Sequence, residues 1–280
     1  MNLETAKKLN SLNNNFYEVI GKYFNHSREY AWEGWDKMVR HGEFGRFVAK
    51  ELPSTLLTPS SKEGQGILNV LELGCGNGRF LEFLLLQKNI ILEKYTGLDA
   101  SDFLLDRADE RLKALDSTNA EFIKTDLLFD SWQDKLTLSD DKRFNLITAF
   151  GLFHHIPSFE FRLKLFTQIH SLLARDGLFI FTTWQFKDVP RLSRRVVDLQ
   201  SVAGQEVISK FEIDIGNFEE NDYILDWHKG FVAHRFSHYY TKPEVEKLCS
   251  SSSFEIVDTF EADGKEGNVN RYYIIQKKQN

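Results

Sequence analysis

The chain has few cysteines, no long apolar run and no cluster of metal-ligating residues. Cys75 and Cys249 are its only cysteines, too few for a disulfide framework, so a reducing cytoplasm is the expected location. No apolar stretch approaches the roughly 18–20 residues that span a membrane, and the start, MNLETAKKLN, has no signal-peptide core. The histidines and cysteines also lack the spacing of a metal site. We therefore expect a cytoplasmic protein with no bound metal ion and no membrane contact.

Positive charge is not in excess either. The formal net charge is −6, so the composition provides no global attraction for nucleic acid. A polyanionic partner would need a local basic patch, and one candidate is the group Lys187, Arg191, Arg194 and Arg195. Such a group is equally typical of a phosphate contact for tRNA and of a solvated helical face.

Residues 67–184 contain apolar runs that alternate between the spacing of a strand and the spacing of a helix. With 42% hydrophobic and 14% aromatic residues, the chain has the composition of a folded protein. The pattern predicts strands at 67–73, 95–99, 120–126, 144–151 and 178–184, with helices at 79–87, 103–115 and 159–174 between them. Asp176-Gly177 is expected to stop the last of these helices. This alternation predicts an α/β fold with a doubly wound, Rossmann-like parallel sheet covered on both faces.

Three other segments complete the predicted organisation. Residues 1–66 are expected to form an amino-terminal helical segment that covers the active site of a main domain at 67–280. Residues 185–238 lack a clear period, as an inserted cap over the carboxyl edge of the sheet would. Thr241 and Glu244 then form a capping-box signature, and FEIVDTF and NRYYIIQKK read as a terminal antiparallel hairpin.

Three glycines follow the first predicted strand, in VLELGCGNGRF. Glycine inside an element costs roughly 0.5–1 kcal/mol relative to alanine, so Gly74, Gly76 and Gly78 indicate a sharp bend or a close approach to the backbone. In a doubly wound sheet the first strand-to-helix turn is the usual ligand contact. Asp99 closes the second strand, where an acidic side chain accepts the hydroxyl groups of a ribose. Together these features predict a nucleoside site.

The charge of this turn favours one class of cofactor. A dinucleotide site typically has the spacing G-x-G-x-x-G, whereas this chain has G-C-G-N-G preceded by Glu72. An acidic side chain there repels a pyrophosphate but suits an amino group and a sulfonium, so the pattern favours S-adenosylmethionine. Asp126, which ends the third predicted strand, is then placed to accept a hydrogen bond from the adenine amino group.

The motifs ELGCGNG, GLDAS and KTD, with the fifth strand, resemble those of the class I S-adenosylmethionine-dependent methyltransferases. The resemblance runs from about Leu68 to the carboxyl terminus and implies a seven-stranded sheet that ends in an antiparallel hairpin. It also implies a set of cofactor-binding residues: Glu72, Gly74, Cys75, Gly76, Asn77, Asp99, Ala100, Asp126, Leu127 and Phe150.

Three further segments are similar to one branch of that family, the tRNA wobble-uridine carboxymethyl methyltransferases. They are FYEVIGKYFNHSREYAWEGWDKM, FGLFHHIPSFEFRLKLFTQIHSLLARDG and RFSHYYTKPEVEKLCSSSSFEIVD. The resemblance implies methylation of the carboxylate of 5-carboxymethyluridine in tRNA, and a small activator protein as a partner. The chain departs from the family pattern at Ala31-Trp32, Asp176-Gly177 and Leu225-Asp226-Trp227.

The chemistry of methyl transfer narrows the candidate catalytic residues. Neither cysteine is placed as a base-attacking nucleophile, and a carboxylate acceptor is already ionised near neutral pH, so cations that orient it are sufficient. Arg28 and Arg235 are the candidate cations, and His154 is a candidate general base. Two other functions stay open: a small-molecule O- or carboxyl-methyltransferase, and a noncatalytic regulator that binds S-adenosylmethionine.

Overall fold

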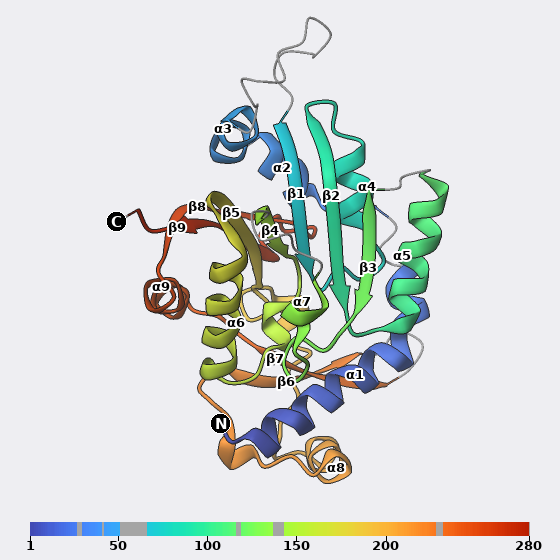
Figure 1. The fold of residues 1–280 in the computed structure, drawn as a ribbon. Coiled ribbons are helices and arrows are strands. Elements are labelled where there is room, and N and C mark those ends of the chain that lie inside the picture. Colours follow the sequence, from blue (N-terminus) through green and yellow to red (C-terminus); the bar gives the residue numbers. More distant parts are fainter. Residues whose placement is uncertain are drawn as a thin grey trace, which may run out of the picture.

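A seven-stranded sheet forms the centre of the protein (Figure 1). The computed structural model describes residues 1–26, 30–40, 42–50, 66–115, 119–136, 143–227 and 232–279. Its sheet has the order β3-β2-β1-β4-β5-β9-β8, in which β9 pairs antiparallel with both neighbours. The strands are β1 (Gly66–Leu73), β2 (Ile90–Asp99), β3 (Ala120–Lys124), β4 (Phe144–Ala149), β5 (Leu173–Trp184), β8 (Phe254–Ala262) and β9 (Asn270–Lys277). The predicted fold class and the terminal hairpin are therefore confirmed.

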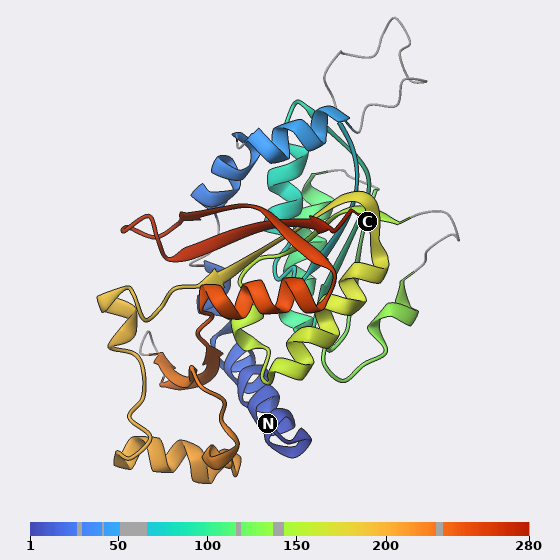
Figure 2. The ribbon, with the colours of Figure 1, turned by 90° about the vertical axis from the view of Figure 1, so that its left-hand side faces the viewer.

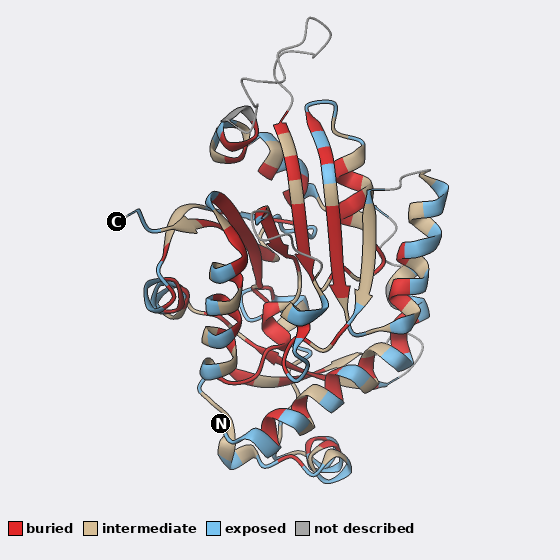
Figure 3. Cartoon of the chain, in the orientation of Figure 1, coloured by how far each residue is buried: buried red, intermediate tan, exposed pale blue. Residues whose placement is uncertain are grey.

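Helices cover both faces of this sheet. Successive residues of a strand point to opposite faces, and in the central strands both sets are apolar. On β5, Phe179 and Phe181 pack toward α6 (Phe159–Leu172) and α9 (Lys242–Ser251). Leu178 and Ile180 pack toward α2 (Glu33–Arg40), α3 (Gly42–Lys50) and α4 (Arg79–Leu85) on the other face. The helix α5 (Asp102–Ala114) packs beside β3. Figure 3 shows the resulting pattern, with buried strands and helices exposed on their outer sides.

The expected helix stop at Asp176-Gly177 is wrong. The helix α6 ends at Leu172, and Leu173 already pairs with Phe144 as the first residue of β5. The pairing resumes between Leu146 and Leu178, so the residues from 174 to 177 bulge out of the strand. The Asp-Gly pair thus lies at an irregularity inside a strand. The same residue pair is typical of the end of a helix, so the sequence alone did not separate the two.

The segment between β5 and α9 forms a small unit of its own, which we call the cap. It contains α7 (Pro190–Ser193), α8 (Val202–Phe211), and an antiparallel pair of β6 (Asp222–Trp227) with β7 (Ala233–His238). The long helix α1 (Leu3–His26) lies beside these strands (Figure 2). Its apolar residues Leu9, Leu12, Phe16 and Ile20 recur at helical spacing and are buried against the cap.

A buried ionic cluster attaches the cap to the main sheet. Arg162 on α6 pairs with Glu219 of the cap at 2.6 Å and with Glu244 of α9 at 3.1 Å. His238 on β7 donates to Asp222 and to Glu244, at 2.7 and 2.9 Å. Thr241 caps α9 as predicted, by accepting from the Glu244 amide, but the Glu244 carboxylate turns to this cluster instead of completing a capping box.

The packing of α2 against β9 leads to a first prediction. A Cβ atom at Gly34 would lie 2.2 Å from the hydroxyl of the fully buried Tyr272. Replacing Gly34 with alanine should therefore lower the free energy of unfolding by about 2–3 kcal/mol. Gly45 on α3 has no atom within 4 Å of such a Cβ, so the same change there should raise that free energy by up to about 1 kcal/mol. Urea denaturation of the two variants measures both, and equal effects would contradict the packing described.

Within the described ranges, none of the helices combines the length and the apolar character that a membrane crossing requires.

Candidate active site

A large cavity opens where β1, β2 and β4 end. Its volume is about 1410 Å³, and its walls come from α1, the glycine turn, the cap and the tip of the β8–β9 hairpin. Sites for one drug-sized ligand are typically about 300–1,000 Å³. The cavity therefore has room for two ligands side by side, as a group-transfer reaction requires.

The glycine turn after β1 forms one wall of this cavity. Gly74, Gly76 and Gly78 have φ angles of 72°, 55° and 73°, in the left-handed region that side chains with a Cβ rarely adopt. A Cβ on Gly76 would meet no atom within 4 Å, so this residue leaves open space beside its backbone. A Cβ on Gly74 would instead press on Leu152 at 3.2 Å. The glycines thus serve both a tight turn and the close approach of a ligand.

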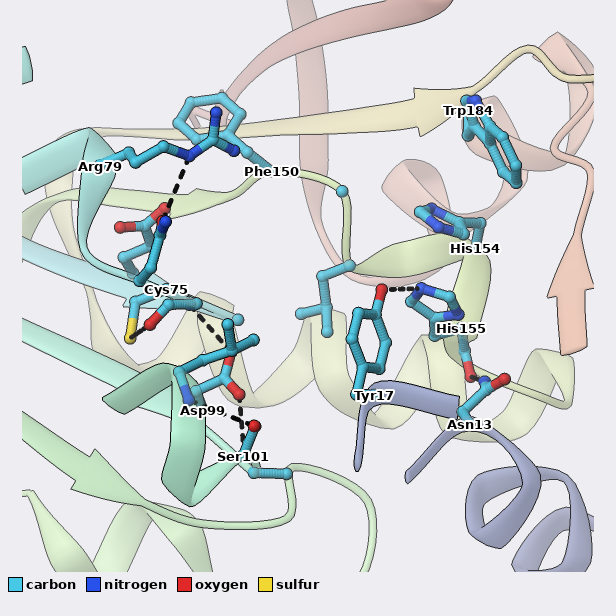
Figure 4. Close-up of a pocket in the computed structure, with 18 of the residues that line it drawn as sticks. Asn13, Tyr17, Cys75, Arg79, Asp99, Ser101, Phe150, His154, His155 and Trp184 are labelled. Carbon is cyan, nitrogen blue, oxygen red and sulfur yellow. Dashed lines mark hydrogen bonds between the residues drawn. The ribbon is translucent and has the colours of Figure 1, made fainter. Parts of the chain in front are cut away.

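Asp99 faces that turn from the end of β2 (Figure 4). One carboxylate oxygen accepts from the amide of Gly76 and the other from the amide of Ser101, each at 2.9 Å. A carboxylate oxygen accepts more than one hydrogen bond, so both oxygens keep a lone pair for a ligand. This arrangement suits the two adjacent hydroxyl groups of a ribose.

An acidic and a basic side chain border the glycine turn. Glu72 is buried at the end of β1, where burial raises the pKa of its carboxyl from 4.5 to about 8, although the Tyr95 hydroxyl donates to it and Arg79 is close. The Arg79 guanidinium donates to Asn77 at 3.2 Å and lies over the ring of Trp35. Sequence reasoning missed Arg79, and its position directly after the last glycine was the available signal. An acid and a cation at this turn match the zwitterionic end of an amino acid.

The raised pKa of Glu72 predicts how stability depends on pH. Between about pH 4.5 and pH 8 the folded protein holds a proton on Glu72 that the unfolded chain has released. The free energy of unfolding should therefore fall as the pH rises across this range, by up to about 4 kcal/mol. Glu72→Gln stays neutral and should flatten the decline, whereas Glu206→Gln on the exposed surface of α8 should not. Urea denaturation at several pH values measures the slopes, and an unchanged slope for Glu72→Gln would refute the assignment.

The structure brings all ten residues predicted for the cofactor to this one cavity. Asp126 lies just beyond β3, and one of its carboxylate oxygens accepts from the amide of Leu128 at 2.9 Å. The other oxygen accepts from the side-chain amide of Asn10 on α1 at 2.6 Å. Phe150 follows β4 and packs edge-on against Phe80, with ring centroids 4.8 Å apart. The sequence did not indicate that α1 reaches the predicted adenine end.

The two cysteines are buried thiols. Burial raises the pKa of Cys75 well above its usual value, with a further contribution from the charge of Asp99. Burial likewise raises the pKa of Cys249 to about 12. Both are therefore protonated at neutral pH and neither is an activated nucleophile. Among the described residues, no three side chains of the metal-ligating types converge on a common point.

Arg235 on β7 lies at the other end of the cavity, with 8% of its surface exposed. Its guanidinium carbon is 4.3 Å from the centre of the Trp184 ring and 5.0 Å from that of Phe16. Within the part of the chain that the structure describes, its Nε has no hydrogen-bond partner and no carboxylate pairs with it. Burial lowers the pKa of Arg235, and the nearby Tyr17 counteracts this in part. Arg28, the other predicted cation, lies outside the described residues.

His154 also lines the cavity, beside Trp184. Its ring lies close to that of His155, with the two ring centroids 4.0 Å apart. The two residues are adjacent in the 3₁₀ turn Phe153–His155. His155 has partners on both ring nitrogens, the hydroxyl of Tyr17 at 2.8 Å and the carbonyl of Phe236 at 3.2 Å.

The four cations predicted to contact tRNA lie in the cap. Three have partners within the protein: Arg191 with Glu266, Arg195 with Asp226, and Lys187 with Tyr223. Arg194 is exposed. Since two of the four charges are balanced by carboxylates, the local excess of positive charge is smaller than the sequence indicated, and a tRNA contact here stays a prediction.

Known proteins share this arrangement of sheet and glycine turn. The family model described as a methyltransferase domain matches residues 38–259. The chain belongs to this methyltransferase family. The match includes the glycine turn, most of the sheet and the cap, and it confirms the enzyme class predicted from ELGCGNG.

Relatives of this methyltransferase have low sequence identity. A malonyl-[acyl-carrier protein] O-methyltransferase of Paenibacillus sp. (strain JDR-2) is 24% identical over 193 residues, which are 69% of this chain. The match spans 64% of that relative's length, less than two thirds. An S-adenosylmethionine-dependent methyltransferase from Clostridium acetobutylicum superposes with a TM-score of 0.55 at 15% identity, covering 92% of this chain and 99% of the other. The DhpI complex with SAH gives 0.54 at 14% identity, covering 98% and 99%. These structures share the fold.

Proposed function

We propose that this methyltransferase transfers a methyl group from S-adenosylmethionine to a carboxylate of a small or carrier-linked organic acid. The observation that carries the proposal is Arg235, a buried cation in the cavity that no carboxylate of the described chain neutralises. A buried charge without an ionic partner is costly, which is expected where a bound anion completes the pair. The name of the Paenibacillus relative, a malonyl O-methyltransferase, supports an acceptor of this kind, because a malonyl group carries one free carboxylate.

S-adenosylmethionine is the cofactor, and the residues at the glycine turn fit each part of it. Asp99 presents two carboxylate oxygens for the ribose hydroxyl groups, and Asp126 lies at the adenine end. Glu72 provides a carboxyl group for the amino group of the methionine part, and Arg79 provides a cation for its carboxylate. The open space beside Gly76 admits the chain that joins these groups. When bound, the cofactor supplies an electrophilic methyl group.

The protein's own contribution is to bind and orient the acceptor. A carboxylate is ionised at neutral pH, so its oxygen attacks without a general base, and its alignment with the methyl group sets the rate. The planar guanidinium of Arg235 fits a carboxylate with two parallel hydrogen bonds. Trp184 and Leu152 provide apolar walls nearby, which reduce access of water and strengthen the ionic contact.

A tRNA wobble-uridine acceptor is the second candidate, and it uses the same chemistry. The carboxymethyl group of the modified uridine is itself a carboxylate, so Arg235 would serve either acceptor. The ion pairs of Arg191 and Arg195 give this candidate less support than the organic acid.

The test is methyl transfer from labelled S-adenosylmethionine to four acceptors. These are malonyl-acyl-carrier protein, free malonate, tRNA that contains 5-carboxymethyluridine, and the same tRNA without the carboxymethyl group. We expect label in a malonyl acceptor that mild base releases, as it releases a methyl ester. Label only in the modified tRNA would replace the organic acid by the wobble uridine, and label that resists base would refute a carboxylate acceptor.

A further inference from the structure

We propose that Asn10 of α1 is a positioning residue of the cofactor site. It holds the Asp126 carboxylate so that one oxygen accepts a hydrogen bond from the adenine amino group, and it ties the position of α1 to the presence of the cofactor. The proposal rests on the proposed placement of S-adenosylmethionine in the cavity and is independent of the identity of the acceptor.

The contact between Asn10 and Asp126 has only one chemical arrangement. The side chain of Asn10 lies 2.6 Å from Oδ2 of Asp126, although 116 positions separate the two residues in the chain. An ionised carboxylate only accepts, so the atom that faces it is the amide nitrogen of Asn10, which donates. Hydrogen bonds to an ionised group are shorter and stronger than those between neutral groups. The helix α1 is therefore bonded directly to the residue predicted for adenine.

Hydrogen-bond donors hold both oxygens of the Asp126 carboxylate. Oδ1 accepts from the amides of Leu128 and Phe129, at 2.9 and 3.3 Å, and Oδ2 accepts from Asn10. The two oxygens of a carboxylate offer about four lone pairs in total, so these donors leave one lone pair, on Oδ2. The backbone amides fix one oxygen and Asn10 fixes the other, which together set the direction of this last lone pair.

An acceptor in this position distinguishes adenine from hypoxanthine. The exocyclic amino group of adenine donates a hydrogen bond, whereas the oxygen that replaces it in hypoxanthine only accepts and is repelled by a carboxylate. Without Asn10, the Asp126 carboxylate would lose a donor and turn more freely about its last bond, so it could rotate away from that oxygen. Asn10 therefore contributes to the specificity for the base as well as to the affinity.

The same side of α1 also holds the acceptor end of the cavity. Asn13 lies one helical turn after Asn10, and its side-chain carbonyl accepts from the amide of Phe236 at 2.8 Å. Its amide nitrogen donates to the carbonyl of His155 at 3.4 Å. Figure 4 shows Asn13 reaching from α1 toward His155. Phe236 directly follows Arg235 on β7, so Asn13 supports the strand from which the guanidinium extends.

These two contacts link the two ends of the cavity through one helix. A ligand that contacts α1 only in its docked position stabilises that position. Asn10 lines the cavity beside Asp126, so an adenine bound to that carboxylate would lie against α1. Cofactor binding should therefore hold α1 against β7 and preserve the wall that carries Arg235.

The first test compares the base preference of variants. Calorimetry measures the dissociation constants of S-adenosylhomocysteine and of S-inosylhomocysteine, in which an oxygen replaces the adenine amino group. The unaltered protein should bind the adenine compound roughly tenfold to a hundredfold more tightly, and Asn10→Ala should reduce this ratio by roughly fivefold. The matched control Asn15→Ala, on the same helix but outside the cavity, should leave the ratio unchanged. A merely structural role of Asn10 would weaken both compounds equally, and an unchanged ratio in Asn10→Ala would overturn the proposal.

Two further variants separate the role of Asn10 from the placement of the cofactor. Asn10→Asp keeps the shape of the side chain but puts a second carboxylate beside Asp126. Two carboxylates at this distance share a proton and can donate it to hypoxanthine, so this variant should lower the ratio further than Asn10→Ala. Asp99→Ala should weaken both compounds by the same factor. Asp99→Ala without effect would refute the cofactor placement, whereas an unchanged ratio in both Asn10 variants would refute the role of Asn10 alone.

The second test follows the Phe236 amide, whose hydrogen bond to Asn13 reports whether α1 is docked. S-adenosylhomocysteine at about 100 times its dissociation constant should slow hydrogen exchange of this amide by at least roughly tenfold, measured by nuclear magnetic resonance. In Asn10→Ala, at the same multiple of its own dissociation constant, the slowing should be less than about threefold. Asn15→Ala should behave like the unaltered protein. Equal slowing in Asn10→Ala and the unaltered protein would overturn the link between cofactor and helix.

Discussion

Replacing Arg235 with methionine should lower kcat/KM for the carboxylate acceptor by roughly a hundredfold to a thousandfold. The change removes two hydrogen bonds to a charged group, and it leaves an apolar side chain to occupy the space between Trp184 and Phe16. The dissociation constant of S-adenosylmethionine should stay within about twofold, because the cofactor residues lie at the glycine turn. Steady-state methyl transfer and titration calorimetry measure the two quantities.

Two further variants make this prediction specific. Arg235→Lys keeps the charge but lacks the planar fork, so its kcat/KM should lie between those of the methionine variant and the unaltered protein. Arg194→Met alters an exposed arginine of the cap region and should leave both quantities unchanged. A parallel loss of cofactor affinity in Arg235→Met would instead assign Arg235 to the cofactor.

Asp99→Ala should weaken cofactor binding by about 1–3 kcal/mol, a loss of roughly tenfold to more than a hundredfold. The variant removes the two carboxylate oxygens that would accept hydrogen bonds from the ribose hydroxyl groups. It also removes the hydrogen bonds that the amides of Gly76 and Ser101 donate to this carboxylate. Calorimetric titration with S-adenosylhomocysteine measures the effect. Asp106→Ala is the control, since that carboxylate is exposed on α5 outside the cavity. Equal affinity in the two variants would show that Asp99 does not contact the ribose.

The main sheet could be predicted because each of its elements has a local pattern. The buried runs of β1, β4 and β5 are nearly continuous, as strands covered on both faces require, and apolar spacing marked α5 and α6. The glycines and Asp99 were identified because their positions relative to strand ends carry the chemistry. Local composition failed at Asp176-Gly177, where pairing of Leu173 with Phe144 overrode the turn signal.

The acceptor end was only partly predictable. Arg235 and His154 were named as candidates from the chemistry of methyl transfer, without their neighbours. Tyr17, Trp184 and Arg235 come from α1, β5 and β7, and no periodicity relates positions so far apart in the chain. The ion pairs that engage Arg191 and Arg195 are likewise contacts across long sequence separations, so the sequence alone made the basic group look more available than it is.

The sequence by itself determined the sheet, the glycine turn and the cofactor class, because these depend on short-range spacing along the chain. The tertiary structure decided which charges remain uncompensated. It neutralised Arg191, gathered Arg162, Glu244 and His238 into the cluster that holds the cap, and left Arg235 buried between aromatic rings, with no carboxylate partner among the described residues. The physical reason is that the energy of a buried charge depends on the groups that surround it in space, and folding alone selects those groups.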